Sequence, residues 1–413
     1  MFFYLKKLFQ AILQHETYLD HAATTPMDAR VFSVMKKIFK DSYGNAGGMY
    51  QLAMNTKAML YESRKKVAML LSTTSDHIIF TRGGTESNNI AIIGTVNHFK
   101  VKHPDMVPHV ITSTIEHDSV LETVRNLEQK KIITASYIPC DEDGIVIVSE
   151  LKKQLRPETI LVSIMYANNE IGTIQPIREI TKLVRWYKKQ LQEQKKLVTS
   201  DQYPLVHTDA IQAVNYCDIN VMRLGVDMMT LSGSKIYGPK SVGALFVKNK
   251  ELLDPIMFGG GHEFGLRSGT EDVAMIAGFT KALEISNELK EQESLRLTQL
   301  RDYLISELET DARINVNGSK TNRLPNNCNI TITGFSSEAL VIQLAAKGFA
   351  VSSKSACQSD TDEESHVIAA IRNAQGFDSQ SEEGSLRITM GRTTTKKDIK
   401  KILQVFWSIV GKK

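Results

Sequence analysis

The sequence has few cysteines, little net charge and no long apolar run. Its four cysteines form no C-x-x-C pair and no Cys/His cluster with metal-ligand spacing, which argues against a disulfide framework and a zinc site. The net charge of +4 gives no electrostatic reason to expect nucleic acid or an anionic membrane as a partner. No segment approaches the ~18 apolar residues that a membrane span needs. These absences predict a cytoplasmic protein without a bound metal that acts on a small molecule.

Short apolar segments alternate with longer helical ones between about residues 77 and 250. The predicted strands cover residues 77–81, 109–114, 159–167, 204–210, 226–233 and 243–248. Their continuous hydrophobicity indicates strands that are buried on both faces. The pattern therefore predicts an α/β fold with a mostly parallel sheet, in which ligands bind beyond the carboxyl ends of the strands.

The 413 residues are enough for more than one domain. We expect a large domain over residues 15–275 and a smaller α+β domain over residues 276–413, joined by the N-terminal segment 1–14. A long charged helix is predicted from Val273 to about Leu308, followed by strands near residues 324–335, 349–353 and 385–391. Residues 2–14 are expected to form a short amphipathic helix packed on the body, with docking to a membrane or partner as the alternative.

The residues after the strand at 77–81 are typical of an anion-binding turn. Two glycines, Gly83 and Gly84, precede Thr85, which is predicted to cap a helix, with Glu86 in the first turn. Backbone N–H groups at a helix N-terminus and a hydroxyl group together bind phosphate well. A helix cap that binds nothing is the alternative interpretation of these residues.

The other predicted strand ends also carry polar groups that could act on one ligand. These groups are His117 after 109–114, Asn168, Asn169 and Glu170 after 159–167, Asp209 and Gln212 after 204–208, and Ser232, Ser234 and Lys235 after 226–231. A lysine and an acid near a phosphate cradle match the needs of pyridoxal 5'-phosphate, because the lysine binds the cofactor as a Schiff base and the acid keeps the ring nitrogen protonated. The alternative is that Asp209 and Lys235 are ordinary loop charges.

Long motifs in a fixed order extend over nearly the whole chain. They are YLDHAATTP (18–26), TRGGTESNNIAIIG, STIEHDSVLET, VSIMYANNEIGTIQPI, HTDAIQAV, LSGSKIYGPKSVGALFVK, GGGHEFGLRSGT, AVSSKSACQS and LRITMGRTTT. On these motifs the sequence resembles the cysteine desulfurases of the NifS/IscS type, in the class V aminotransferase family. The resemblance implies the type I fold of pyridoxal phosphate enzymes, with a large domain whose mostly parallel seven-stranded sheet lies between helices, and a smaller α+β domain.

The resemblance also implies roles for individual residues. Lys235 would be the Schiff-base lysine, Asp209 the partner of the pyridine nitrogen, and His117 a catalytic residue stacked on the ring. The remaining cofactor contacts would come from Gly84, Thr85, Asn169, Gln212, Ser232, Ser234 and, from a second subunit of a homodimer, Thr270. Arg387 would bind the substrate carboxylate, which suits a planar bidentate donor, and Asn45 would belong to the same substrate site.

Cys357 matches the nucleophile of the family, where a thiolate attacks the sulfur of L-cysteine. The products would be L-alanine and a persulfide on Cys357, and the sulfur would pass to an acceptor protein of iron–sulfur cluster assembly or tRNA thiolation. Three positions depart from the family pattern: the segment 45–54 keeps Asn45 but loses its serines and histidine, Ser234 replaces a histidine, and Lys354 replaces a glycine near Cys357.

Two alternatives to a cysteine desulfurase stay open on the sequence. The first is a selenocysteine lyase or another lyase or transaminase of the same family, although transamination needs no thiol such as Cys357. The second is a catalytically reduced homologue that acts as a binding partner, motivated by the altered segment 45–54. Five residues kept together argue against such a loss of activity, namely Lys235, Asp209, His117, Cys357 and Arg387.

Overall fold

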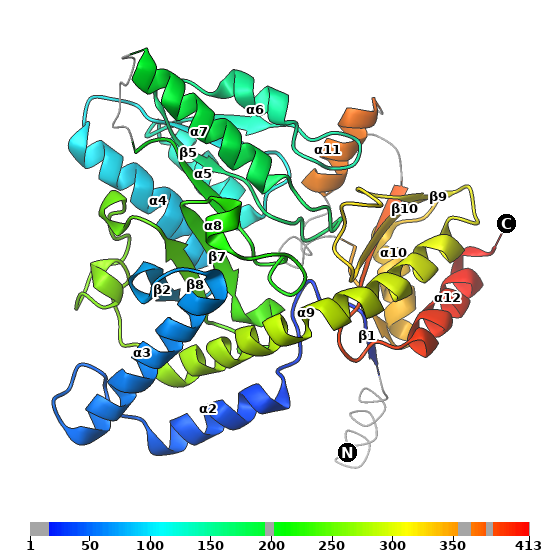
Figure 1. Cartoon of the computed structure of the whole chain (residues 1–413). Coiled ribbons are helices and arrows are strands. Elements are labelled where there is room, and N and C mark those ends of the chain that lie inside the picture. The colour runs from blue at the N-terminus through cyan, green and yellow to red at the C-terminus, as the bar shows by residue number, and fades with distance from the viewer. Residues whose placement is uncertain (1–15, 195–201, 354–364, 377–382, 413) are drawn as a thin grey trace.

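The computed structural model describes residues 16–194, 202–353, 365–376 and 383–412, the last beginning with the backbone of residue 383 (Figure 1). Within these residues the largest sheet has seven strands in the order β2-β8-β7-β6-β5-β3-β4. Their bounds are β2 (Ile78–Thr81), β3 (His109–Ser113), β4 (Thr134–Ile138), β5 (Thr159–Ser163), β6 (Leu205–Asp209), β7 (Met228–Ser232) and β8 (Gly243–Val247). Only β8 runs antiparallel to its neighbours β2 and β7, so the predicted mostly parallel sheet is confirmed.

Both faces of this sheet are covered by helices. Along β2, Ile78 and Phe80 pack into one hydrophobic core while Ile79 packs into another, as expected for a strand with a period of two. The helices α4 (Gly84–Lys102) and α5 (Asp118–Gln129) cover the face of Ile79. The opposite face packs against α2 (Ala29–Asp41), α3 (Gln51–Leu71), α6 (Val148–Gln154), α7 (Ile177–Glu193), α8 (Val221–Leu224) and part of α9 (Val273–Leu308).

A second group of elements surrounds a three-stranded antiparallel sheet in the order β12-β10-β9. The elements with their bounds are β9 (Ile314–Val316), β10 (Asn327–Thr333), β12 (Glu383–Thr389), α10 (Ser337–Ala346) and α12 (Lys396–Val410). A short parallel pair, β1 (Thr17–Tyr18) with β11 (Phe349–Ala350), lies beside them. The separate hydrophobic core of this group explains why the sequence reads as a smaller α+β unit.

The long helix α9 confirms the prediction for residues 273–308. It runs from the first group of elements to the second (Figure 1). Val273, Phe279 and Leu283 belong to the core under the large sheet, whereas Leu297 and Leu304 belong to the core of the second group. The division at residues 275 and 276 stays a prediction. Helix α11 (His366–Gln375) follows later in the chain but packs against the core of the large sheet.

Three strands were not predicted from the sequence. β4 lies at the edge of the large sheet and is mostly half-exposed, while β1 has two residues and β9 has three, so none of them has the apolar run that marks the inner strands of the large sheet. None of the helices in the described part of the chain combines the length and the hydropathy that a membrane span requires. The expected helix at residues 2–14 lies outside the described residues.

Candidate active site

A cavity of about 420 Å³ opens at the carboxyl ends of the parallel strands. The sequence-predicted residues that line it are Gly84, Thr85, His117, Asn169, Asp209, Gln212, Ser232, Ser234, Lys235 and Arg387. Parallel strands bring their carboxyl ends to one edge of the sheet, which is why the residues from Gly84 to Lys235 meet here, whereas Arg387 comes from β12 of the other sheet. The cavity is also lined by Arg82, Lys240 and the segment 22–24, which the sequence analysis did not assign to the site.

Two predicted site residues among the described ones do not line this cavity. Asn45 and Thr270 are exposed and line a neighbouring cavity of about 330 Å³, which Arg82 also borders. The Asn45 Oδ1 accepts a hydrogen bond from the Gly47 backbone N–H at 2.8 Å. Cys357 lies outside the described residues, as does Lys354.

The glycine-rich turn leads into α4 as expected, but the predicted cap is wrong. The N-cap is Gly83, whose φ of 131° is a conformation that favours glycine, and Thr85 is already inside the helix. A Cβ atom on Gly84 would lie 2.1 Å from the Ile211 Cδ1, so the backbone of this turn lies close to the loop after β6. The first turn of α4 therefore presents its backbone N–H groups at the cavity.

Asp209 ends β6 and is buried, with two neutral hydrogen-bond donors. Its Oδ2 accepts from the Asn88 Nδ2 at 2.8 Å, and its Oδ1 accepts from the Ile211 N–H at 2.9 Å. The same Asn88 amide donates to the Ser119 Oγ at 2.8 Å, and Ser119 Oγ lies 2.9 Å from the His117 Nδ1. Asn88 in α4 and Ser119 in α5, neither of which was predicted from the sequence, therefore connect two predicted site residues.

Lys235 follows β7 in a short 3-10 turn, and its Nζ donates to the Ala23 carbonyl. The N-terminal segment packs over this turn, because the Thr25 backbone N–H and hydroxyl both donate to the Ser234 carbonyl at 2.9 Å. Ser234 Oγ lies 3.2 Å from Ser232 Oγ. The lysine is therefore not a surface charge, since its amine faces the cavity wall that residues 22–24 provide.

Glu116 lies fully buried beside His117 and was not assigned a role from the sequence. Its Oε1 accepts from the Ser113 hydroxyl at 2.6 Å and from the Met165 N–H at 2.9 Å. Burial raises the pKa of Glu116 to about 8, and the charge of Asp209 adds to this increase. A neutral carboxyl group therefore lies behind the cavity at neutral pH.

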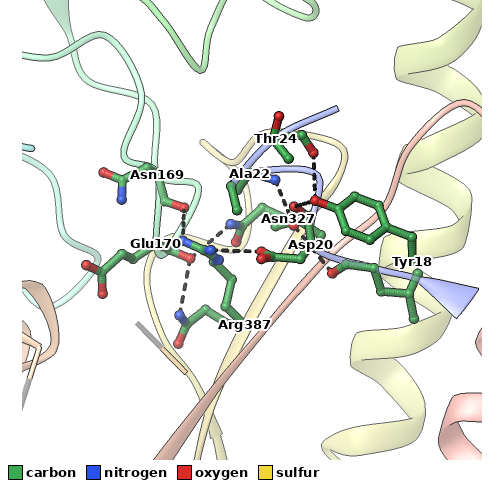
Figure 2. Close-up of polar contacts among 12 residues, drawn as sticks. Tyr18, Asp20, Ala22, Thr24, Asn169, Glu170, Asn327 and Arg387 are labelled. Atoms are coloured by element: carbon green, nitrogen blue, oxygen red, sulfur yellow. Dashed lines mark hydrogen bonds and ion pairs between the residues drawn. The ribbon is translucent and has the colours of Figure 1, made fainter. Parts of the chain in front are cut away.

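Arg387 comes from β12 in the second group of elements and reaches the cavity with a side chain that is 1% exposed. Figure 2 shows its guanidinium group between Asp20 and the backbone of Asn169. The Nη2 donates to the Asp20 Oδ1 at 2.8 Å, and the Nη1 donates to the Asn169 carbonyl at 3.2 Å. Asp20 was not predicted, although it lies in the quoted motif YLDHAATTP.

The family model "Aminotransferase class-V" matches residues 17–402 of the chain. The chain belongs to this family. It is 41% identical over 401 residues to a cysteine desulfurase IscS of Dictyoglomus turgidum, a match that covers 97% of this chain and 96% of the relative. This relationship confirms the expected resemblance to cysteine desulfurases.

Solved structures agree with the sequence relatives. A NifS-like protein superposes with a TM-score of 0.84 at 31% identity, covering 96% of this chain and 99% of its own. The structure of SspA in complex with cysteine superposes with a TM-score of 0.75 at 31% identity, covering 90% of this chain and 98% of its own. The chain therefore has the NifS-like fold that the sequence predicted, and the class V aminotransferases are pyridoxal-phosphate enzymes.

Proposed function

We propose that the protein is a pyridoxal 5'-phosphate-dependent cysteine desulfurase, which converts L-cysteine to L-alanine and leaves the sulfur as a persulfide on Cys357. One observation carries the proposal: Lys235, Asp209 and the buried Arg387 line the same cavity. An amine, an acid and a guanidinium group are the three functions that binding the cofactor and an amino acid requires. The relationship to cysteine desulfurases supports this reading of the cavity.

The residues of the cavity fit the cofactor. The glycine turn before α4 leaves room and backbone donors for a phosphate group, helped by Thr85 and by the hydroxyls of Ser232 and Ser234. Asp209 receives only amide donors in the described contacts, so its charge is available to hold a proton on the ring nitrogen. His117, Asn169 and Gln212 line the same cavity and would contact the ring.

When bound, the cofactor supplies an electron sink for the bonds that break at the substrate. Lys235 would hold it covalently and then move the substrate proton, since its amine is released when the substrate amine takes its place. Arg387 would bind the substrate carboxylate and orient the side chain, and His117 would hold or move a second proton. The Cys357 thiolate would attack the substrate sulfur, so that a new S–S bond forms while the C–S bond breaks.

The proposal includes the partners and the location. A homodimer would bring Thr270 of a second copy to the phosphate, and a sulfur-acceptor protein would take the sulfur from Cys357. The roles of Asn45 and Thr270 depend on that second copy, since both lie outside the cavity within one chain. A cytoplasmic location is supported by the free thiols of Cys140, Cys217 and Cys328.

The test is to add L-cysteine to the protein loaded with cofactor and to measure sulfide and alanine. We expect equal amounts of both in the presence of a reductant, and loss of sulfide release in Cys357→Ala. Cys217→Ala is the matched control, because burial raises the pKa of the Cys217 thiol to about 12 and keeps it protonated. Sulfide release that persists unchanged in Cys357→Ala would remove the persulfide step, and no release from the natural sequence would overturn the proposed function.

A further inference from the structure

The guanidinium group of Arg387 has donors that the described contacts do not use. The side chain is buried, and only one hydrogen bond of Nη1 and one of Nη2 are made within the described residues. The Nε is buried and has no hydrogen-bond partner in the described part of the chain. A buried, charged donor without an acceptor is unfavourable, so this edge of the group is suited to an acceptor from a ligand.

Asp20 is held in place by backbone contacts to the strand that carries Arg387. The Leu19 carbonyl accepts from the Thr389 N–H at 2.7 Å, and the His21 N–H donates to the Thr389 carbonyl at 3.2 Å. The Tyr18 hydroxyl donates to the Asp20 carbonyl at 2.9 Å. Arg387 and Thr389 are two residues apart on β12, so their side chains lie on the same face of the strand. The Asp20 carboxylate is thereby fixed beside the guanidinium group (Figure 2).

We propose that Asp20 is a positioning residue: it occupies the Nη2 of Arg387 and so turns the unpartnered Nε edge toward the carboxylate of the substrate. This inference rests on the proposed function, in which Arg387 binds that carboxylate. An ion pair in a partly buried site fixes the plane of a guanidinium group, because the bond is both charged and directional. The Asn169 carbonyl accepts a hydrogen bond from the Nη1 but adds no charge. Asp20 therefore contributes to affinity for the carboxylate without touching the substrate.

The experiment compares two ligands on Asp20→Asn in the presence of the cofactor. L-Alanine carries the carboxylate and ethylamine is the same molecule without it, and the binding of each is followed by the absorbance of the bound cofactor. We expect D20N to bind L-alanine about tenfold more weakly, the loss of roughly one charged hydrogen bond, and to bind ethylamine as the natural sequence does. A purely structural role for Asp20 would weaken the binding of both ligands alike.

Asp28→Asn is the matched control. Asp28 has a side chain of similar exposure, 13% against 17% for Asp20, and pairs with Arg30 at 2.8 Å and with Arg392 at 3.2 Å, but neither of these arginines lines the cavity as Arg387 does. We expect D28N to leave the affinities for L-alanine and ethylamine unchanged. An unchanged affinity of D20N for L-alanine would overturn the inference.

A double variant covers the case in which D20N destabilises the fold. In an Arg387→Ala background there is no buried guanidinium group to leave unpaired, and Asp20→Asn is expected to cause no further loss of L-alanine affinity. A further loss in that background would show that Asp20 acts on its own and would overturn the inference. The proposed function fails separately, by the absence of sulfide release from the natural sequence.

Discussion

Two groups of residues in the cavity are assembled in different ways. The lysine group, Lys235 with Asp209 and the turn at Gly84, consists of residues that lie at the ends of strands of one sheet or within three residues after them. The arginine group, Arg387 with Asp20 and the Asn169 carbonyl, joins positions that are 367 and 218 residues apart. The first group follows from the order of the strands in a parallel sheet. The second depends on how the N-terminal segment and β12 pack together, so chain order alone does not predict it.

The largest effect is expected at the lysine group. Lys235→Ala removes the amine that holds the cofactor and moves the proton, so cysteine turnover should fall to background. Reduction with borohydride followed by mass spectrometry should find the cofactor on Lys235 in the natural sequence and on no lysine in the variant. Lys248→Ala, an exposed lysine outside the cavity, is the control. Cofactor fixed to another lysine in the natural sequence would contradict the assignment of Lys235.

The arginine group should affect the substrate more than the cofactor. Arg387→Ala removes the charged guanidinium group from the proposed carboxylate site, and we expect kcat/KM for L-cysteine to fall about 100-fold, mainly through KM. The variant should still bind pyridoxal phosphate, as its absorbance would show. Arg313→Ala, which breaks an arginine–aspartate pair away from the cavity, should leave KM unchanged. If the R387A variant lost the cofactor as completely as Lys235→Ala does, the two groups would not differ in function.

Substitution of Asn88 tests whether the lysine group depends on a residue that lies inside a helix and not at the end of a strand. In Asn88→Ala the Asp209 Oδ2 loses its amide donor, and we expect roughly tenfold weaker retention of the cofactor, measured by dialysis and absorbance. Asn89→Ala is the neighbouring control on α4, whose amide donates to the Thr85 carbonyl instead. Equal retention in the N88A and N89A variants would mean that Asp209 needs no such support.

At Glu116 we expect a change in the pH dependence of stability. Because burial raises the pKa of this group from 4.5 to about 8, the unfolded chain releases the proton at a lower pH than the folded protein. The free energy of unfolding therefore falls as the pH rises from 4.5 to about 8, by up to about 1.4 kcal/mol per pH unit from this group. Glu116→Gln should remove that slope.

Urea unfolding at several pH values between 5 and 8 would measure the effect, with the exposed Glu142→Gln as control. Relative to the natural sequence, E116Q should gain stability at pH 8 more than at pH 5. Parallel curves for the natural sequence and E116Q would show that Glu116 ionises normally in the folded protein.

Most of the fold could be predicted because its signals are local. The predicted apolar runs correspond to strands that are buried on both faces, namely β2, β3, β5, β6, β7 and β8. A continuous apolar run is typical of such a strand. β4 was missed because an edge strand buries less and needs fewer apolar residues. The helix cap was placed at Thr85 because a hydroxyl residue is the usual cap, whereas the turn required the positive φ of Gly83.

The sequence by itself determined that polar groups follow the apolar strands. It thereby determined that Lys235, Asp209 and His117 meet. These residues follow apolar runs within a few positions, and parallel strands carry whatever follows them to the same edge. Only the tertiary structure decided that Asn88 and Ser119 connect Asp209 with His117, and that Asp20 holds Arg387. Such contacts depend on side-chain directions and on packing between distant segments, which no periodicity along the chain encodes.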